Sequence, residues 1–483
     1  MKDLYTKYCN CGYRVTTDSR AIKGGEIFFA LRGETFDGNA FAVKALEDGA
    51  AWAVVNDDAD LPADERLIRV ADPLTTLRDL AVWHRTHVRD GKLPVIGLTG
   101  TNGKTTTKNL IEAVLARKFK VTATKGNLNN DIGVPLSLLS ITPETEIAVI
   151  EMGANHPDDI EKLVRVSQPD YGLITNVGRA HLLGFGSFEG VKQAKGALYR
   201  WLGSRPGSLI FLNEDDEDLR VMAAGLPCHF FGYGMKYQGA ELLPTSPEEP
   251  FLWLRLRDCE VHTQLVGAYN AANVLAALAI GEYFGVPRAE AVAAVEAFTP
   301  SNQRSQMVRT ERNTLIVDAY NANPSSMKAA LENFAAMQAS VKLALLGDMR
   351  ELGAESLAEH VKVVEQLRSA GIPAILVGEE FAKAVAAAGC TPLAGKAIRL
   401  RPSSLFPQQA AGCGRVTPDS LPGRAASQPD RDPSVIPSEV EGSAVFPDSA
   451  ALAAWLHDNP VSGAAILVKG SRGIQMEKVL PEL

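Results

Sequence analysis

Short apolar runs alternate with helical stretches from Pro94 onward. Residues 95–99 form one such run, and apolar side chains recur at helical spacing over 105–118. The alternation continues with strands predicted at 147–150, 171–175 and 208–212, and with helices predicted at 158–166, 188–202 and 268–283. Because strands separated by helices of this length need crossover connections, the pattern predicts a mostly parallel sheet.

Two further α/β regions flank the first. Before Pro94, strands are predicted at 25–31 and 51–55 with a short helix at 40–48, which indicates a small module. Beyond a boundary near Pro300, the third region contains strands predicted at 315–317, 342–346, 374–377 and 465–468, with helices between them. The chain is therefore expected to be an α/β protein throughout.

One segment, 401–444, breaks this rhythm. It is rich in Pro, Ser, Gly, Asp and Arg and has few aromatic residues. Such a composition buries too little apolar surface to offset the entropy of ordering the chain. We predict a disordered insertion without a catalytic role, and a segment that orders on binding a partner is the alternative.

The composition agrees with a multidomain globular protein. A length of 483 residues suggests two to four domains, and 46% hydrophobic with 22% charged residues is ordinary for soluble proteins. The net charge of -8 leaves no excess of Lys and Arg to neutralise nucleic-acid phosphates. We therefore expect no nucleic-acid partner, although a local basic pocket for an anionic metabolite is compatible with this charge.

The cysteines and the N-terminus indicate a cytoplasmic protein. Six cysteines are scattered, and only Cys9 and Cys11 lie close together, which is not a zinc ligand set. The N-terminus lacks the apolar stretch of a secretory signal, and no apolar run reaches the length of about 18 residues expected of a membrane span.

The segment 99–107 joins a predicted strand to a predicted helix and has the composition of a phosphate-binding loop. Its glycines let the backbone approach oxygen atoms, and amides at the helix start point at an anion. A strict phosphate loop would have glycine at position 98, where this chain has Leu98, so a chance glycine-rich turn is the alternative. The candidate nucleotide-binding residues are Gly100, Thr101, Asn102, Gly103, Lys104, Thr105 and Thr106.

Three ionisable residues follow this loop in the same predicted domain. Glu151 ends a strand, where α/β sheets place ligands, and its carboxylate suits magnesium; a solvated strand-end Glu is the alternative. His181 would face the same cleft, yet a lone His is equally well structural. From the residues alone, Lys195 is interpreted as a surface lysine.

Polar residues also gather at 127–130, 318–324 and 469–472. The first segment holds Asn127, Asn129 and Asn130, whose amides offer donors and acceptors to a polyhydroxylated ligand. The other two follow predicted strands. Ordinary turns are the alternative for all three.

Taken in order, these segments resemble the Mur ligases of peptidoglycan synthesis over nearly the whole chain except 401–444. The resemblance implies an N-terminal uridine-nucleotide module at 1–92, a central phosphate-loop ATPase at 93–300 and a C-terminal Rossmann-like domain at 301–483. The supporting segments are Thr17-Asp-Ser-Arg20, Phe28-Phe-Ala-Leu31, Gly100-Thr-Asn-Gly-Lys-Thr105, Asn127-Leu-Asn-Asn130, Glu151-Met-Gly153, His181, Ala194-Lys195, Asn270 with Asn273, Tyr320-Asn-Ala-Asn-Pro324 and Lys469-Gly-Ser-Arg472.

The resemblance also implies ATP and two magnesium ions as cofactors, with a carbamate on the Lys195 amine as a metal ligand. The implied metal ligands are Thr105, Glu151, His181 and Lys195, and the implied catalytic residues are Lys104, Lys195, His181 and Glu151. The implied ATP contacts outside the loop are Asn270, Asn273, Arg304 and Asp318. The implied substrate-binding residues are Ser19, Arg20, Asn127, Asn129, Asn130, Tyr320, Asn321, Asn323, Ser471 and Arg472.

Two positions depart from the family pattern. Tyr269 stands where many relatives carry a His, and no glycine precedes Arg304.

The implied reaction is ATP-dependent formation of an acyl phosphate on UDP-N-acetylmuramoyl-tripeptide, followed by attack of the D-alanyl-D-alanine amine. Segments such as Glu-Met-Gly-Ala and Tyr-Asn-Ala-Asn-Pro favour the dipeptide-adding member of the family. A diaminopimelate-adding or folylpolyglutamate-type amide ligase is the alternative within the superfamily, and a nucleotide-gated binding module is the alternative outside it. We expect a monomer.

Overall fold

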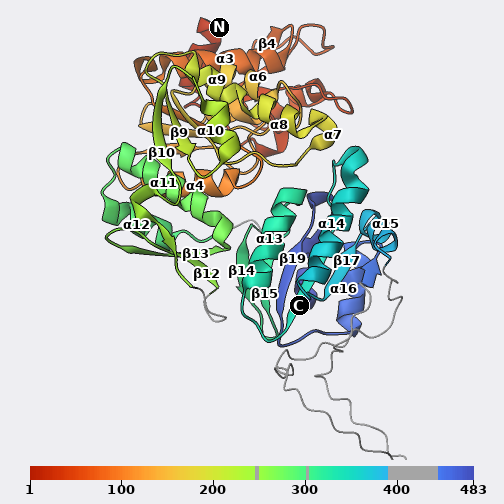
Figure 1. The fold of residues 1–483 in the computed structure, drawn as a ribbon. Coiled ribbons are helices and arrows are strands. Elements are labelled where there is room, and N and C mark those ends of the chain that lie inside the picture. Colours follow the sequence, from red (N-terminus) through yellow and green to blue (C-terminus); the bar gives the residue numbers. More distant parts are fainter. Residues whose placement is uncertain (245–249, 301–303, 390–443) are drawn as a thin grey trace, which may run out of the picture. The chain divides into compact units, whose positions relative to one another are not determined.

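The computed structural model describes residues 1–244, 250–300, 304–389 and 444–483 (Figure 1). The predicted insertion 401–444 lies outside these ranges except for Ala444, which begins a strand and is no part of an insertion. The chain forms two compact units. The first holds the described residues up to Pro300 other than Pro250, together with 351–353, and the second holds the remaining described residues.

The N-terminal sheet contains four parallel strands in the order β1-β2-β3-β4. Its strands are β1 (Val15–Thr16), β2 (Ile27–Phe29), β3 (Trp52–Asn56) and β4 (Leu67–Val70). The accompanying helices are α1 (Lys2–Asn10), α2 (Ala42–Glu47) and α3 (Pro73–His87). The predicted strands at 25–31 and 51–55 and the helix at 40–48 are confirmed as β2, β3 and α2. Asp72 caps α3 by accepting hydrogen bonds from the amides of Leu74 and Thr75.

The central sheet has six strands in the order β10-β9-β8-β5-β7-β6, and every adjacent pair is parallel, as predicted. The strands are β5 (Val95–Thr99), β6 (Val121–Ala123), β7 (Ile147–Glu151), β8 (Tyr171–Ile174), β9 (Leu209–Asn213) and β10 (His229–Tyr233). The helices are α4 (Lys104–Leu115), α5 (Gly133–Leu138), α6 (Asp159–Ser167), α7 (Leu182–Phe185), α8 (Phe188–Lys195), α9 (Ala197–Gly203), α10 (Glu217–Ala223), α11 (Ala271–Tyr283) and α12 (Arg288–Ala297).

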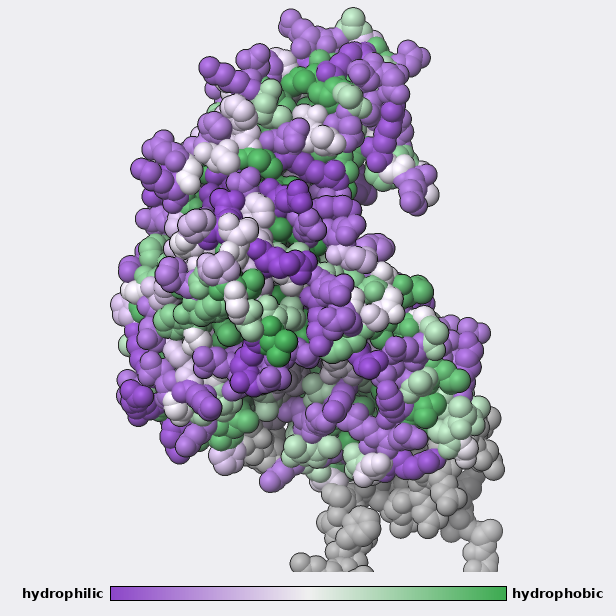
Figure 2. Space-filling model, turned by 45° about the horizontal axis from the view of Figure 1, so that its top comes forward, coloured by the Kyte–Doolittle hydropathy of each residue, from purple (hydrophilic) through white to green (hydrophobic). Residues whose placement is uncertain are grey.

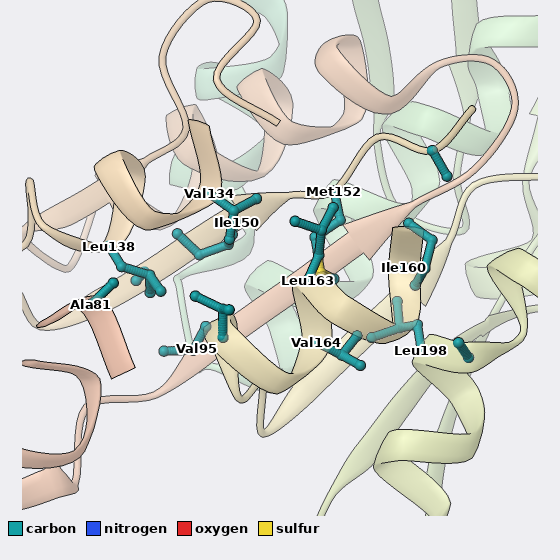
Figure 3. Packing of buried hydrophobic residues seen from close by; sticks show 14 of the residues in the cluster. Ala81, Val95, Val134, Leu138, Ile150, Met152, Ile160, Leu163, Val164 and Leu198 are labelled. Atoms are coloured by element: carbon teal, nitrogen blue, oxygen red, sulfur yellow. The ribbon is translucent and has the colours of Figure 1, made fainter. Parts of the chain in front are cut away.

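Alternate side chains of the central strands enter two different cores. On β5, Val95 joins a cluster with residues of α3, α5, α6 and α9, whereas Ile96 and Leu98 join a cluster with residues of α4 and α11. Figure 3 shows the first of these, with Ile150 of β7 packed among residues of the covering helices. Because Leu4 and Ile27 belong to that same cluster, one core extends from the N-terminal module into the central sheet.

The central region differs from the prediction in several ways, and its strands β6 and β10 were not predicted. The predicted helix at 188–202 is two helices, α8 and α9, which meet at Gly196. An antiparallel sheet of β11 (Glu241–Leu242), β12 (Phe251–Arg255) and β13 (Glu260–Val266) was not predicted. Its longest strand alternates exposed and buried residues, the pattern of a sheet with one solvated face.

The second unit contains a six-stranded sheet in the order β14-β15-β19-β16-β17-β18, in which only β14 is antiparallel to its neighbour. The strands are β14 (Gln306–Arg309), β15 (Thr314–Asp318), β16 (Lys342–Gly347), β17 (Ala374–Val377), β18 (Ala444–Phe446) and β19 (Ala465–Lys469). The helices are α13 (Pro324–Ala336), α14 (Ser356–Ser369), α15 (Glu379–Ala387) and α16 (Ser449–Asp458). The four strands predicted here are confirmed as β15, β16, β17 and β19.

The described cysteines carry free thiols, and the face shown in Figure 2 is mostly hydrophilic. Cys9, Cys11, Cys228 and Cys259 are free thiols. Hydrophilic residues cover most of the face shown in Figure 2, and apolar residues appear in separate groups. Within the described ranges, no helix combines the length and the apolar character that crossing a membrane requires.

A buried histidine lies in the core shared by the N-terminal module and the central sheet. His84 on α3 has no exposed surface, and its Nε2 lies 3.0 Å from the carbonyl oxygen of Ile141. Its Nδ1 lies 3.3 Å from the Tyr5 hydroxyl, and the ring of Tyr8 meets the imidazole edge to face. Burial lowers the pKa of His84 from 6.5 to about 4, so the folded protein holds a neutral imidazole.

This histidine should make the first unit less stable in acid. The unfolded chain binds a proton at His84 below pH 6.5, whereas the folded chain does so only near pH 4. The neutral His84 therefore contributes to the free energy of unfolding above pH 6.5. This contribution is lost as the pH falls, by about 2 kcal/mol at pH 5. We expect the free energy of unfolding to fall less between pH 7.5 and 5.0 in His84→Gln than in the unchanged protein. The exposed His457→Gln is the control, and equal losses in all three proteins would contradict the expectation.

Candidate active site

The predicted phosphate loop lies where the central sheet reverses its strand order. Strand β5 lies between β7 and β8, and the chain builds the β7-β6 side before it crosses to β8. Such a reversal leaves the carboxyl end of the middle strand open to a ligand. The loop 100–103 follows β5 directly and leads into α4, so its position agrees with a nucleotide site.

Two glycines allow the loop to fit against its neighbours. Gly100 has φ +150°, and a Cβ there would lie 1.9 Å from the Thr175 hydroxyl oxygen. Gly103 has φ +79° at the start of α4, and a Cβ there would lie 2.7 Å from Oδ1 of Asn273. Side chains at either position would therefore collide with the end of β8 or with α11.

Hydrogen bonds from the end of β8 hold the loop in place. The amide of Thr101 donates to the Asn176 carbonyl at 3.0 Å, and the amide of Asn102 donates to Asn176 Oδ1 at 3.0 Å. In the other direction, the Thr175 hydroxyl donates to the Asn102 carbonyl at 2.6 Å. These hydrogen bonds give the loop a defined conformation.

Lys104 bends back over the loop that precedes it. Its Nζ donates to the carbonyl oxygens of Gly100 at 2.8 Å and Thr101 at 3.0 Å. The ammonium group is thereby held at the loop, at the positive end of α4, where phosphate oxygens would gather.

Glu151, at the end of β7, is a buried carboxylate that is only half satisfied. Its side chain is almost fully covered, with 1% of the residue exposed. Oε1 accepts hydrogen bonds from Thr105 Oγ1 at 3.2 Å and from Asn129 Nδ2 at 2.8 Å. Oε2 is buried and has no hydrogen-bond partner among the described residues. A buried carboxylate oxygen without a partner is destabilising unless a cation or a donor completes it, so this group fits a magnesium ligand.

His181 begins the short helix α7 with a left-handed backbone, φ 52°. Burial lowers the pKa of its imidazole, Glu351 opposes this shift, and the positive charges of Lys104 and Lys195 add to it. Both lysines thus act electrostatically on His181, and its predicted role as a metal ligand stays a prediction.

Lys195 is not a surface lysine, so the interpretation from residues alone was wrong. Only 2% of the residue is exposed, and its Nζ lies 5.7 Å from the ring centre of Phe185. Burial, reinforced by the charge of Lys104, lowers the pKa of the amine well below its usual range. Val191, Ala194 and Lys195 are the buried residues of α8, and their spacing places them on one helical face. That spacing was the signal that could have identified a buried lysine.

The Asn-rich loop contacts the Glu151 carboxylate through one residue. Asn129 donates to Glu151 Oε1, and its carbonyl accepts from the amide of Gly153 at 2.7 Å. Asn130 Oδ1 accepts the amide of Gly133 at 2.9 Å, at the start of α5. Asn127 is exposed. The structure therefore brings Asn129 to the site, while Asn130 serves a local turn.

Asn270 and Asn273 form a buried chain of hydrogen bonds beneath the loop. Asn273 Oδ1 accepts from the Thr107 hydroxyl at 2.9 Å, and its Nδ2 donates to Asn270 Oδ1 at 2.9 Å. Asn270 Nδ2 donates to the Val266 carbonyl at 2.9 Å. These contacts support the loop from α11, and the predicted contact with adenine stays a prediction.

The second unit gathers a separate group of predicted residues at the carboxyl ends of β15 and β19. Lys469 is 1% exposed and donates to Asp318 Oδ2 at 2.5 Å and to the Asn321 carbonyl at 3.2 Å. The guanidinium of Arg304 lies 3.7 Å from the ring centre of Tyr320, and that of Arg472 lies 5.2 Å from the same centre. Aromatic faces attract cations, so the tyrosine holds both arginines beside it.

Several predicted substrate residues are engaged in local structure. Asn323 caps α13 by accepting the Ser326 amide at 2.9 Å, and the buried Ser471 hydroxyl donates to the Asp348 carbonyl at 2.6 Å. The Arg20 guanidinium donates hydrogen bonds to the Asp18 carboxylate, in its own turn beside Ser19.

Three residues that hold these sites in place were given no site role from the sequence, although Lys469 lies in the polar segment 469–472. Asn176 and Thr175 secure the loop from the end of β8, and Lys469 secures Asp318. All three stand at or directly after the end of a parallel strand, so the rule that predicted Glu151 could have found them.

Within the described ranges, no group of three or more His, Cys, Asp or Glu side chains is placed to hold a metal ion.

Three family models match consecutive parts of the chain. The Mur ligase family, catalytic domain matches residues 13–84, the Mur ligase middle domain matches 98–281, and the Mur ligase, glutamate ligase domain matches 303–401. The three-domain architecture that the resemblance implied is confirmed.

The chain is similar to curated bacterial enzymes. It is 36% identical over 345 residues to the UDP-N-acetylmuramoyl-tripeptide–D-alanyl-D-alanine ligase of Bacillus subtilis, covering 70% of this chain and 74% of the relative. The enzyme of the same name from Escherichia coli is 36% identical over 375 residues, covering 76% and 81%.

Solved structures have the same fold. MurF of Acinetobacter baumannii matches with a TM-score of 0.76 at 27% identity, covering 97% of this chain and 93% of that one. The MurF ligase of Thermotoga maritima, solved in complex with ADP, matches with a TM-score of 0.75 at 24% identity, covering 100% and 98%.

The glycine at the start of α4 provides a test of the loop. In Gly103→Ala, the new Cβ would meet Asn273 and adopt an unfavourable left-handed backbone, so we expect ATP to bind at least about tenfold more weakly. Gly207→Ala is the matched control, because Gly207 has φ +82° with open space around its Cβ position. Calorimetric titration with ATP measures both, and unchanged affinity in Gly103→Ala would refute this account of the loop.

Proposed function

The chain belongs to the Mur ligase family, and from that premise we propose that it joins D-alanyl-D-alanine to UDP-N-acetylmuramoyl-tripeptide with consumption of ATP. Curated relatives of that name match more than two thirds of their own length at 36% identity. The structural observation that carries the proposal is the buried Glu151 carboxylate beside Thr105 and the phosphate loop. The product is a precursor for peptidoglycan.

The free carboxylate of the tripeptide is a poor electrophile, and phosphorylation by ATP converts it into an acyl phosphate. Lys104, held at the loop carbonyls, neutralises charge on the transferring phosphoryl group. The dipeptide amine then attacks the acyl carbon, and phosphate leaves as the amide bond forms. Holding the amine against the acyl phosphate contributes roughly 7–11 kcal/mol through proximity and orientation.

Two magnesium ions are part of this proposal. Glu151 and Thr105 would hold one, since both present oxygen atoms and Glu151 Oε2 is buried without a partner among the described residues. His181, Glu151 and a carbamate on Lys195 would hold the other. When bound, magnesium supplies positive charge that stabilises the phosphates during transfer.

Carbamylation of Lys195 agrees with its surroundings. Carbon dioxide reacts with a neutral amine, and burial beside Lys104 favours the neutral form by lowering the pKa of Lys195. The product is an anion, which replaces repulsion between two cations by attraction to Lys104 and to a metal ion. The conversion of its amine into an anion distinguishes Lys195 from an ordinary buried lysine.

The remaining predicted residues belong to the same proposal. Arg304 and Asp318 would contact the ATP phosphates and ribose, and Asn270 and Asn273 would support or contact the adenine side. The UDP-sugar would be received by Ser19, Arg20, Asn127, Asn129 and Asn130, and the dipeptide by Tyr320, Asn321, Asn323, Ser471 and Arg472. We further propose that the enzyme works as a monomer in the cytoplasm, where ATP is available.

Phosphate release tests the proposed reaction. Purified protein with ATP, magnesium and UDP-N-acetylmuramoyl-tripeptide should release phosphate rapidly only after D-alanyl-D-alanine is added, because the amine completes the turnover. Diaminopimelate and glutamate, each supplied with the acceptor that its own ligase uses, serve as competing substrates. Phosphate release with one of these substrates, but not with the dipeptide, would identify another amide ligase. If phosphate is released with none of the substrates, a nucleotide-gated binding module remains as the alternative.

Lys195→Ala should lose most of the activity, because the anionic metal ligand is removed. The matched control is Lys192→Ala, on the same helix and paired with Asp218 at 2.7 Å. With ¹³C-labelled bicarbonate, a carbamate signal should appear in the unchanged protein and in Lys192→Ala, and be absent from Lys195→Ala. A signal that persists in Lys195→Ala, or full activity of that variant, would refute carbamylation at this residue.

A further inference from the structure

Three arginines of the second unit converge without an acidic partner. Arg304 and Arg472 lie 3.7 Å and 5.2 Å from the ring centre of Tyr320. Arg350, which follows β16, reaches across the backbone of Gly473, where a Cβ would lie only 2.8 Å from its guanidinium carbon. Because Gly473 is next to Arg472 in the chain, the three side chains surround one end of the C-terminal sheet.

Glu351, which follows Arg350 in the chain, contacts His181, and two further acids near this cluster are also engaged. Asp318 pairs with Lys469, and the Asp348 carboxylate accepts the amides of Glu380 at 3.1 Å and Phe381 at 2.9 Å, at the start of α15. Within the described ranges, none of the three arginines forms an ion pair with a carboxylate. Like charges brought together repel each other, so an anion that joins the cluster would be attracted to it and would reduce this repulsion.

We propose that Arg350, together with Arg472, binds the carboxylate of the incoming dipeptide. This inference rests on the proposed function. A dipeptide acceptor uses its amine in the reaction and keeps its carboxylate, so a fixed cationic site can orient it without hindering attack. The planar guanidinium fork matches a carboxylate with two parallel hydrogen bonds, which a point charge cannot form.

A phosphate of the nucleotide is the other oxyanion that this chemistry could bind. The first unit already supplies a phosphate site in the loop 100–105, with Lys104 at its carbonyls. Arg350 and Arg472 are both exposed, as a site for a diffusing substrate requires. These observations favour the dipeptide carboxylate as the anion that Arg350 and Arg472 bind.

Gly473 belongs to the same proposed carboxylate site. Its backbone leaves the space that the Arg350 guanidinium occupies, and its φ is not left-handed, so an alanine there introduces no backbone strain. Gly473→Ala would therefore displace the Arg350 side chain while leaving the charge of the cluster unchanged.

The test compares D-alanyl-D-alanine with its C-terminal amide, which lacks the negative charge. The unchanged enzyme should prefer the acid in kcat/KM by about 10- to 100-fold, the range expected of a hydrogen-bonded charge pair. In Arg350→Met, the preference should shrink towards unity through a higher KM for the acid, with the KM for ATP unchanged. Gly473→Ala should shrink it partly. Lys328→Met, an exposed cation on α13, is the control and should retain the preference.

The outcomes separate the possible anions. The inference would be overturned if Arg350→Met keeps the preference for the acid over the amide. It would also be overturned if the unchanged enzyme shows no such preference. A higher KM for ATP with an intact preference would also overturn it and identify a phosphate as the anion. Failure of the unchanged enzyme to use the dipeptide at all would refute the proposed function itself, and this inference with it.

Discussion

The candidate nucleotide site depends on how closely the backbone of the loop after β5 approaches its neighbours. At Gly100 the chain passes against Thr175 at the end of β8, and at Gly103 it passes against Asn273 of α11. These approaches leave no space for a Cβ, and they place the loop amides and the start of α4 at the edge where the strand order reverses. The positions of Lys104 and Thr105 follow from this backbone. A loose loop would leave the ammonium and the hydroxyl without defined places.

Charge that the protein does not itself neutralise marks both candidate sites. In the first unit, a buried amine at Lys195 and a half-satisfied carboxylate at Glu151 lie near the loop. In the second, the guanidinium groups of Arg304 and Arg472 meet at the ring of Tyr320. A folded protein rarely keeps buried or clustered charges without compensation, because desolvation and repulsion are both destabilising. Ligands that carry the opposite charge, such as a metal ion, a phosphate or a carboxylate, explain why these groups are tolerated.

The structure also separates residues that resemble one another in the sequence. Asn129 and Asn130 are neighbours, yet one donates to Glu151 and the other begins α5. Ser471 and Arg472 are likewise adjacent, and the serine is buried against Asp348 whereas the arginine is exposed beside Tyr320. Successive side chains at a strand end or turn point in different directions, so adjacency in a motif does not imply a shared role.

The amino-acid sequence was enough to predict much of the alternation of strands and helices, the parallel character of the central sheet and the position of the loop 100–105, but not the antiparallel sheet of β11, β12 and β13. These features depend on local periodicity and on the short distance between a strand and its following helix, both of which are visible along the chain. The three-dimensional fold was needed to show that Lys195 is buried, that His84 lies in a core shared by two sheets, and that Arg350 reaches Gly473. Each of these depends on which distant segment covers a given face, and that is settled by packing among elements far apart in the chain.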